Sequence, residues 1–167
     1  MRLYIVRHAI AVPRGTPEVE DDDRALTEEG IAKMKQAAAG LNVLDYVPEL
    51  ILSSPLLRAR QTAEILLKAF GKSVELKISP ALAPSGARQE LYHDISLAEK
   101  KLKSLMLVGH QPSLGEIAGE IVFGSPEHFV DLKKGGACAI ELEGVRGTLK
   151  GSLVALLTPS ILRKIVV

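Results

Sequence analysis

Leu3-Tyr4-Ile5-Val6-Arg7-His8-Ala9 is the stretch that decides the fold. Its first four residues are apolar without alternation, which is typical of a strand buried on both faces inside a parallel sheet. Arg7 and His8 then place a fixed cation and a titratable ring nitrogen at the carboxyl end of that strand. Because open α/β sheets bind ligands at the carboxyl ends of their strands, we expect these two residues to form the floor of an active site.

Further predicted strands alternate with helical segments along the chain, which favours an α/β fold with a mostly parallel sheet. Strands are expected at 49–52, 73–78 and 105–108, and an antiparallel hairpin pairs 137–142 with 148–157 across residues 144–147. Helices are expected at 27–41, 56–70, 88–103 and 112–123, with a short final turn within 159–167. The pattern predicts a three-layer α/β/α sandwich whose mostly parallel central sheet ends in an antiparallel C-terminal hairpin.

Composition limits the class of protein. A chain of 167 residues with 47% apolar residues predicts one domain, spanning residues 1–167. A formal net charge of +1 and 4% aromatic residues without Trp argue against nucleic acid and membrane partners. Cys138 is the single cysteine, so neither an intramolecular disulfide nor a cysteine zinc cluster can form. The N-terminal apolar run is too short for a signal sequence, so we expect a cytoplasmic protein; oligomeric state is left open.

Three predicted strands end in residues that suit a phosphate group. Parallel strands bring their carboxyl ends to one rim of the sheet, so these residues are expected to converge. Arginine holds phosphate oxygens in a planar fork, and helix N-termini add N–H donors. The residues that follow these strand ends are Arg7, His8, Ser53, Ser54, Arg58, Gly109 and His110.

Four segments, in order, resemble motifs of the histidine phosphatase superfamily. Arg7-His8-Ala9 is similar to the first signature, although Ala9 stands where Gly is usual. Order, spacing and length are most similar to the SixA-type phosphohistidine phosphatases along essentially the whole chain, which implies a phosphoglycerate mutase-like fold. The other three segments are Arg24-Ala25-Leu26-Thr27-Glu28-x-Gly30, Ser54-Pro55-x-x-Arg58-Ala59-x-x-Thr62-Ala63 and Gly109-His110.

The resemblance implies a mechanism. His8 is expected to attack phosphorus through one ring nitrogen, giving a covalent phosphohistidine that water then hydrolyses. A neutral imidazole, with an ordinary pKa of ~6.5, is a usable nucleophile at neutral pH. Arg7, Arg58 and His110 are expected to stabilise charge on the phosphoryl oxygens. The resemblance also implies that Arg24 and Ser54 contact phosphate or substrate, and that neither a metal nor a cofactor is needed, because side chains supply the cations.

A general acid is the one component that the sequence leaves open. Larger members of the superfamily use a carboxylic acid to protonate an alkoxide leaving group. Glu90 and the run Asp21 to Asp23 are candidates here, although that acidic run also fits a solvated loop. A phosphorylated imidazole needs less help, because once protonated it leaves as neutral imidazole. We therefore predict a signalling phosphatase that acts on phosphohistidine in a protein, such as a phosphorelay domain.

Two other functions stay open. A phosphatase of small phosphorylated metabolites on the same fold would need a positioned acid, and a non-catalytic phosphate-binding module would not need a nucleophile. His93 and His128 have no companion ligands in the pattern and are expected to be structural or solvated. Cys138 is expected to be a buried strand residue, because free cysteine behaves as a small hydrophobe.

Overall fold

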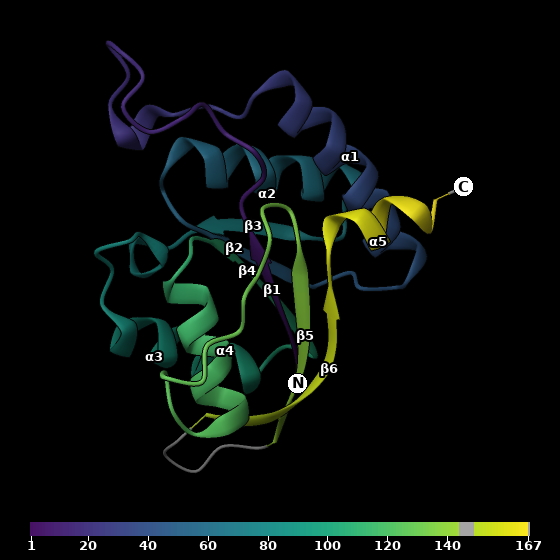
Figure 1. Ribbon diagram of the computed structural model, residues 1–167. Helices are drawn as coiled ribbons and strands as arrows, with labels where there is room; N and C mark the ends of the chain where they lie inside the picture. Colours follow the sequence, from purple (N-terminus) through teal and green to yellow (C-terminus); the bar gives the residue numbers. More distant parts are fainter. Residues whose placement is uncertain (144–148, 167) are drawn as a thin grey trace.

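The computed structural model describes residues 1–143 and 149–166, which form a six-stranded sheet between two layers of helices (Figure 1). The sheet order is β3-β2-β4-β1-β5-β6, with β3, β2, β4 and β1 parallel and β5 antiparallel to both of its neighbours. The predicted α/β/α sandwich and C-terminal hairpin are confirmed; the expected turn at 144–147 lies outside the described residues. The strands are β1 (Arg2–Arg7), β2 (Leu50–Ser53), β3 (Glu75–Ile78), β4 (Ser104–Gly109), β5 (Ala137–Glu143) and β6 (Lys150–Leu157).

Helices cover both faces of the sheet. Figure 1 shows α1, α2 and α5 on one side and α3 and α4 on the other. Two short 3₁₀ turns, η1 and η2, lie in the loops after β1 and β3. The bounds are η1 (Asp21–Asp23), α1 (Glu28–Val43), α2 (Leu57–Phe70), η2 (Pro80–Leu82), α3 (Arg88–Glu99), α4 (Ser113–Phe123) and α5 (Pro159–Lys164).

Strand β1 is buried on both faces, as its unbroken apolar run predicts. Leu3 and Ile5 belong to the core beneath α3 and α4, whereas Tyr4 and Val6 belong to the core beneath α1 and α2. All four side chains are at most 5% exposed. Burial on both sides fixes the register of the strand, because a slip of one residue would exchange the two sets of side chains.

Helix α3 is shorter than its sequence pattern predicts. It ends at Glu99, whereas the apolar spacing suggested an end near Lys103. The carboxylate of Glu49 accepts a hydrogen bond from the backbone N–H of Lys103, and the carbonyl of Lys103 accepts one from Arg2. These bonds hold Lys103 in an extended path into β4, so the helix has to stop before it.

The N-terminus of α1 holds the loop that follows β1 in place. Thr27 caps the helix by accepting a hydrogen bond from the Gly30 N–H at 3.0 Å, and its own N–H donates to the Ile10 carbonyl. A Cβ atom at Gly30 would lie 2.0 Å from that carbonyl oxygen. The glycine that interrupts the usual capping box is therefore required by this close approach of two backbones.

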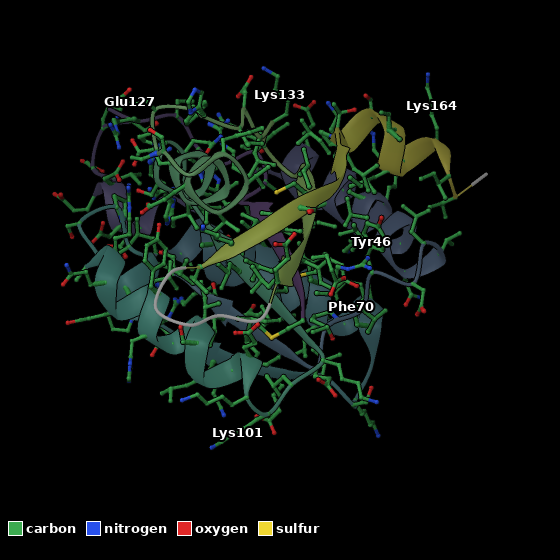
Figure 2. The ribbon with its side chains drawn as sticks, turned by 90° about the horizontal axis from the view of Figure 1, so that it is seen from below. Tyr46, Phe70, Lys101, Glu127, Lys133 and Lys164 are labelled. Carbon is green, nitrogen blue, oxygen red and sulfur yellow. The ribbon has the colours of Figure 1, made fainter. Side chains whose placement is uncertain are left out.

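The outside of the molecule carries long charged side chains. Figure 2 shows Lys101, Lys133 and Lys164 projecting from the periphery. Cys138, in contrast, is 1% exposed in β5, as expected. Within residues 1–143 and 149–166, none of the helices combines the length and the apolar character needed to cross a bilayer.

Candidate active site

The strand register brings the predicted site residues to one rim of the sheet. Arg7 pairs with Gly109 between β1 and β4, and Ser53 pairs with Val108 between β2 and β4. His8 and His110, the next residues of β1 and β4, therefore emerge at the same level, and Ser54, the next residue of β2, lies level with Gly109. The His8 and His110 rings lie with their centroids 5.1 Å apart.

His8 is held as a neutral imidazole with one free ring nitrogen. Its Nδ1 lies 2.7 Å from the Ala9 carbonyl oxygen, and the side chain is 6% exposed. A carbonyl can only accept, so Nδ1 carries the proton and Nε2 presents its lone pair. Burial lowers the pKa of His8 to about 4, and the nearby charges of Arg58, Arg7 and Lys134 act in the same direction. The ring is thus neutral at neutral pH, with a lone pair available on Nε2.

His110 is equally buried and also neutral. It is 4% exposed, and its Nε2 lies 2.7 Å from the Ser54 hydroxyl oxygen. Burial lowers the pKa of His110 to about 3, with further contributions from His8 and Arg58. Its other nitrogen, Nδ1, is buried and has no hydrogen-bond partner among the described residues.

Arg7 is fixed by a segment that the sequence motifs do not include. One terminal nitrogen of Arg7 donates to the Leu132 carbonyl at 2.8 Å, and Gly135 N–H donates to the carbonyls of both Arg7 and His8. The loop from α4 to β5 reaches this rim because β5 runs antiparallel, so its start lies beside the end of β1. The sequence pattern predicted the antiparallel β5–β6 hairpin, but it gave no signal that the loop before β5 contacts Arg7. Burial lowers the pKa of the Arg7 guanidinium.

Arg58 enters the site from the first turn of α2 and is held by η1. The side chain is 2% exposed. One of its terminal nitrogens donates to the Asp21 carbonyl at 2.6 Å, and the other to the Asp21 carboxylate at 3.2 Å. Arg24 and Arg14 each donate from Nε to the same carboxylate at 2.9 Å. Hydrogen bonding from Arg14, with the charges of Arg58 and Arg24, lowers the pKa of Asp21 to about 2.

Thr62 joins the segment of Arg7, His8 and Ala9 to the segment that contains Arg58. Its hydroxyl donates to the Arg58 carbonyl at 2.7 Å and accepts the Ala9 N–H at 3.1 Å. Because the Ala9 carbonyl orients His8, Thr62 indirectly positions the His8 ring. Thr62 belongs to the quoted arginine motif, one helical turn after Arg58, so its place in the motif was the available signal.

The candidate acids separate in the structure. Asp21 is the member of the described set that hydrogen-bonds Arg58, whereas Asp22 and Asp23 are exposed. Glu90 is exposed on α3 and lines a separate hollow with Ser79, Gln89, His93 and Asp94. The role of Glu90 as a general acid therefore stays a prediction, since Glu90 lines a hollow that does not include the two site histidines. His93 and His128 are exposed, as expected for solvated residues.

A cavity of about 370 Å³ adjoins His110. Its walls come from the loop between η2 and α3 and from the start of α4, and they include the ion pair of Arg88 with Glu116. Among the four central site candidates, His110 lines this cavity, whereas Arg7, His8 and Arg58 do not.

Comparison with known proteins places the sequence motifs in a known superfamily. The model of the histidine phosphatase superfamily (branch 1) matches residues 3–85, which contain the first three of the four motifs. An uncharacterized protein of Picosynechococcus sp. is 42% identical over 148 residues, covering 87% of this chain and 88% of its own.

Solved structures resemble the chain along nearly its whole length. The tungstate complex of the protein histidine phosphatase SixA has a TM-score of 0.84 at 22% identity, covering 96% of this chain and 98% of its own. A protein assigned as the phosphohistidine phosphatase SixA of Agrobacterium tumefaciens has a TM-score of 0.76 at 29% identity, covering 95% and 97%. A protein assigned as an alpha-ribazole-5'-P phosphatase of Escherichia coli has a TM-score of 0.71 at 18% identity, covering 96% and 98%.

Proposed function

We propose that this chain, which belongs to the histidine phosphatase superfamily, hydrolyses phosphohistidine carried on another protein. The family supports a phosphatase, and the substrate is our inference from the site. The observation that carries it is that three arginines, Arg14, Arg24 and Arg58, donate to the carboxylate of Asp21, the candidate acid, which keeps that group ionised and without a proton to give at neutral pH.

The first step transfers the phosphoryl group from one imidazole to another. The Nε2 lone pair of His8 attacks phosphorus, a new N–P bond forms and the N–P bond of the substrate breaks. The substrate ring, protonated on its other nitrogen, leaves as neutral imidazole. His8 becomes a phosphorylated ring that still carries its Nδ1 proton, and this N–H keeps its bond to the Ala9 carbonyl. Arg7, Arg58 and His110 stabilise the charge on the phosphoryl oxygens.

The second step reverses the chemistry with water. Water attacks phosphorus, the His8 Nε2–P bond breaks, and the electron pair returns to Nε2. Because Nδ1 is already protonated, His8 leaves as neutral imidazole and needs no proton from the protein. Departure as a neutral ring also makes imidazole a good leaving group in the first step, whereas an alkoxide has to be protonated by a general acid as it leaves.

A small phosphorylated metabolite is the second candidate substrate. The structural likeness to an alpha-ribazole-5'-P phosphatase assignment supports it, since that fold serves a phosphate ester. It would require that Asp21 regain a proton when phosphate draws the arginines away, or that Glu90 reach the leaving group.

One experiment separates the two. Wild type, Asp21→Asn and Glu90→Gln are compared on a phosphohistidine peptide and a phosphoserine peptide, by kcat/KM. We expect the phosphohistidine peptide to be strongly preferred, with neither substitution acting on the phosphoserine peptide alone. Equal turnover of both peptides by wild type, with a loss confined to phosphoserine in either variant, would establish the ester as substrate and identify its acid.

The same proposal leads to expectations about the partner protein, the cellular location and the need for a metal. A phosphorelay domain exposing phosphohistidine fits as partner, in signalling within the cytoplasm. Side-chain cations suffice for charge stabilisation, so we expect a chelator such as EDTA to leave kcat/KM unchanged. A rate restored by added divalent metal after chelation would contradict this part of the proposal.

A further inference from the structure

Ser54 is completely buried behind His110, and its hydroxyl contacts that ring. The residue has no exposed surface, and the Ser54 oxygen lies 2.7 Å from Nε2 of His110. The motif resemblance placed Ser54 among the phosphate or substrate contacts. Its hydroxyl oxygen already contacts His110 Nε2 and accepts the Leu56 N–H, so both of these hydrogen bonds lie within the protein and the side chain acts through its neighbour.

We propose that Ser54 donates its hydroxyl proton to Nε2 of His110, which fixes His110 as the Nδ1–H tautomer and keeps Nδ1–H as the donor for a phosphoryl oxygen. Ser54 is thus a positioning residue. The proposal relies on the phosphatase function only for the identity of the acceptor, because the tautomer exists in the protein without substrate.

Counting donors and acceptors selects this direction. A serine hydroxyl has one proton and two lone pairs. The Leu56 N–H already uses one lone pair at 3.3 Å. If His110 donated from Nε2 as well, two donors would meet at the Ser54 oxygen, and the hydroxyl proton would be buried without an acceptor among the described residues.

The state of the opposite ring nitrogen supports the same tautomer. Reversing the bond would leave two buried groups unsatisfied, the Ser54 proton and a bare lone pair on His110 Nδ1. The proposed direction leaves one, the Nδ1–H donor, and a buried group without a partner costs about 1–3 kcal/mol. A bound phosphoryl oxygen is an acceptor that removes this cost, whereas it would repel a lone pair.

The two site histidines then share a tautomer but use opposite atoms. His8 is Nδ1–H because the Ala9 carbonyl accepts its proton, and it presents the Nε2 lone pair as nucleophile. His110 is Nδ1–H because the Ser54 hydroxyl occupies Nε2, and it presents Nδ1–H as donor. The backbone acceptor makes His8 the nucleophile, and the side-chain donor makes His110 the charge stabiliser, although both residues are histidines.

The test is ¹⁵N NMR of the protein labelled at histidine, without substrate at neutral pH, where the nitrogen shifts report the tautomer of each ring. We expect His110 to show protonated Nδ1 and unprotonated Nε2, and His8, bonded to a backbone carbonyl, to serve as an internal standard. Adding inorganic phosphate should move the His110 Nδ1 signal more than its Nε2 signal. Protonated Nε2 in wild-type His110 would overturn the proposal, whatever substrate the enzyme hydrolyses.

Ser54→Ala with Ser53→Ala as matched control extends the test to function. Ser53 is an equally buried serine, but its hydroxyl donates to the Ser54 carbonyl rather than to a histidine ring. We expect Ser54→Ala to mix the tautomers of His110 and to lower kcat/KM about 10- to 100-fold, as for outer partners of metal-bound histidines. The control should keep the Nδ1–H tautomer of His110. An unchanged His110 tautomer in Ser54→Ala would refute the assigned role even if activity fell.

Discussion

Lowering the pH from 7.5 to 5.5 should leave the nucleophile almost entirely active. A histidine with the ordinary pKa of ~6.5 is about 9% neutral at pH 5.5, whereas one with a pKa of about 4 is about 97% neutral. The buried position of His8 beside Arg58 and Arg7 therefore predicts about tenfold more active enzyme at pH 5.5 than an exposed histidine would give. Because the rings of His8 and His110 are close, the acid limb belongs to the pair.

The assay is the pH dependence of kcat/KM, which reports groups of the free enzyme. The ionisations of the substrate's phosphate group and ring nitrogen are titrated separately and divided out, because phosphate groups ionise near pH ~6 and imidazole near pH ~6.5. A parallel ¹⁵N titration follows His8 and His110 directly, with the exposed His93 and His128 as reference signals.

Agreement of both measurements on titration well below pH 6.5 would support the reasoning. A fall in kcat/KM with an apparent pKa near 6.5 after correction, matched by protonation of His8 in the NMR titration, would refute it. In that case solvent would have to reach the ring far more readily than its 6% exposure implies.

Three further predictions follow from the same geometry. His8→Ala should abolish turnover and the acid-labile, base-stable phosphoenzyme while keeping the circular dichroism spectrum; wild-type hydrolysis by this variant would end the mechanism. Arg58→Ala should lower kcat/KM by about 3–4 kcal/mol of transition-state stabilisation, the range for lost oxyanion donors, and a loss below tenfold in steady-state kinetics would contradict it. The free energy of unfolding should fall as pH drops from 6.5 toward 4, because His8 is protonated in the unfolded chain over this range but stays neutral in the folded protein. The loss is up to about 3 kcal/mol for this ring. Urea titrations showing a gain in stability over that range would count against this prediction.

The rim of the site was predictable because strand ends carry it. Arg7, His8 and His110 follow apolar runs that identify themselves as buried strands, and parallel pairing of β1 with β4 brings their ends together. Arg58 was predictable from its place in the first turn of the helix that follows β2. None of these inferences needed long-range information beyond the direction of the strands.

The supports of the site were not predictable for a physical reason. Leu132 holds Arg7 through its carbonyl, and Asp21 holds Arg58 partly through its carbonyl. Every residue has a carbonyl, so no residue type marks these positions in a sequence. The 3₁₀ turn of η1 likewise decides that Asp21, rather than Asp22 or Asp23, pairs with Arg58. The acidic run alone does not show which of its residues faces the arginine.

Ala9 shows why a departure from a motif can leave the chemistry intact. The superfamily pattern usually has Gly at this position, yet the site uses only the backbone of Ala9: its N–H donates to Thr62 and its carbonyl accepts from His8. Left-handed backbone is recorded for Glu18 and Asp45 among the non-glycine residues described, so Ala9 has no conformation that demands glycine. The residue is 3% exposed and belongs to the core beneath α1 and α2. The position therefore constrains main-chain direction and available space, and both remain satisfied by alanine.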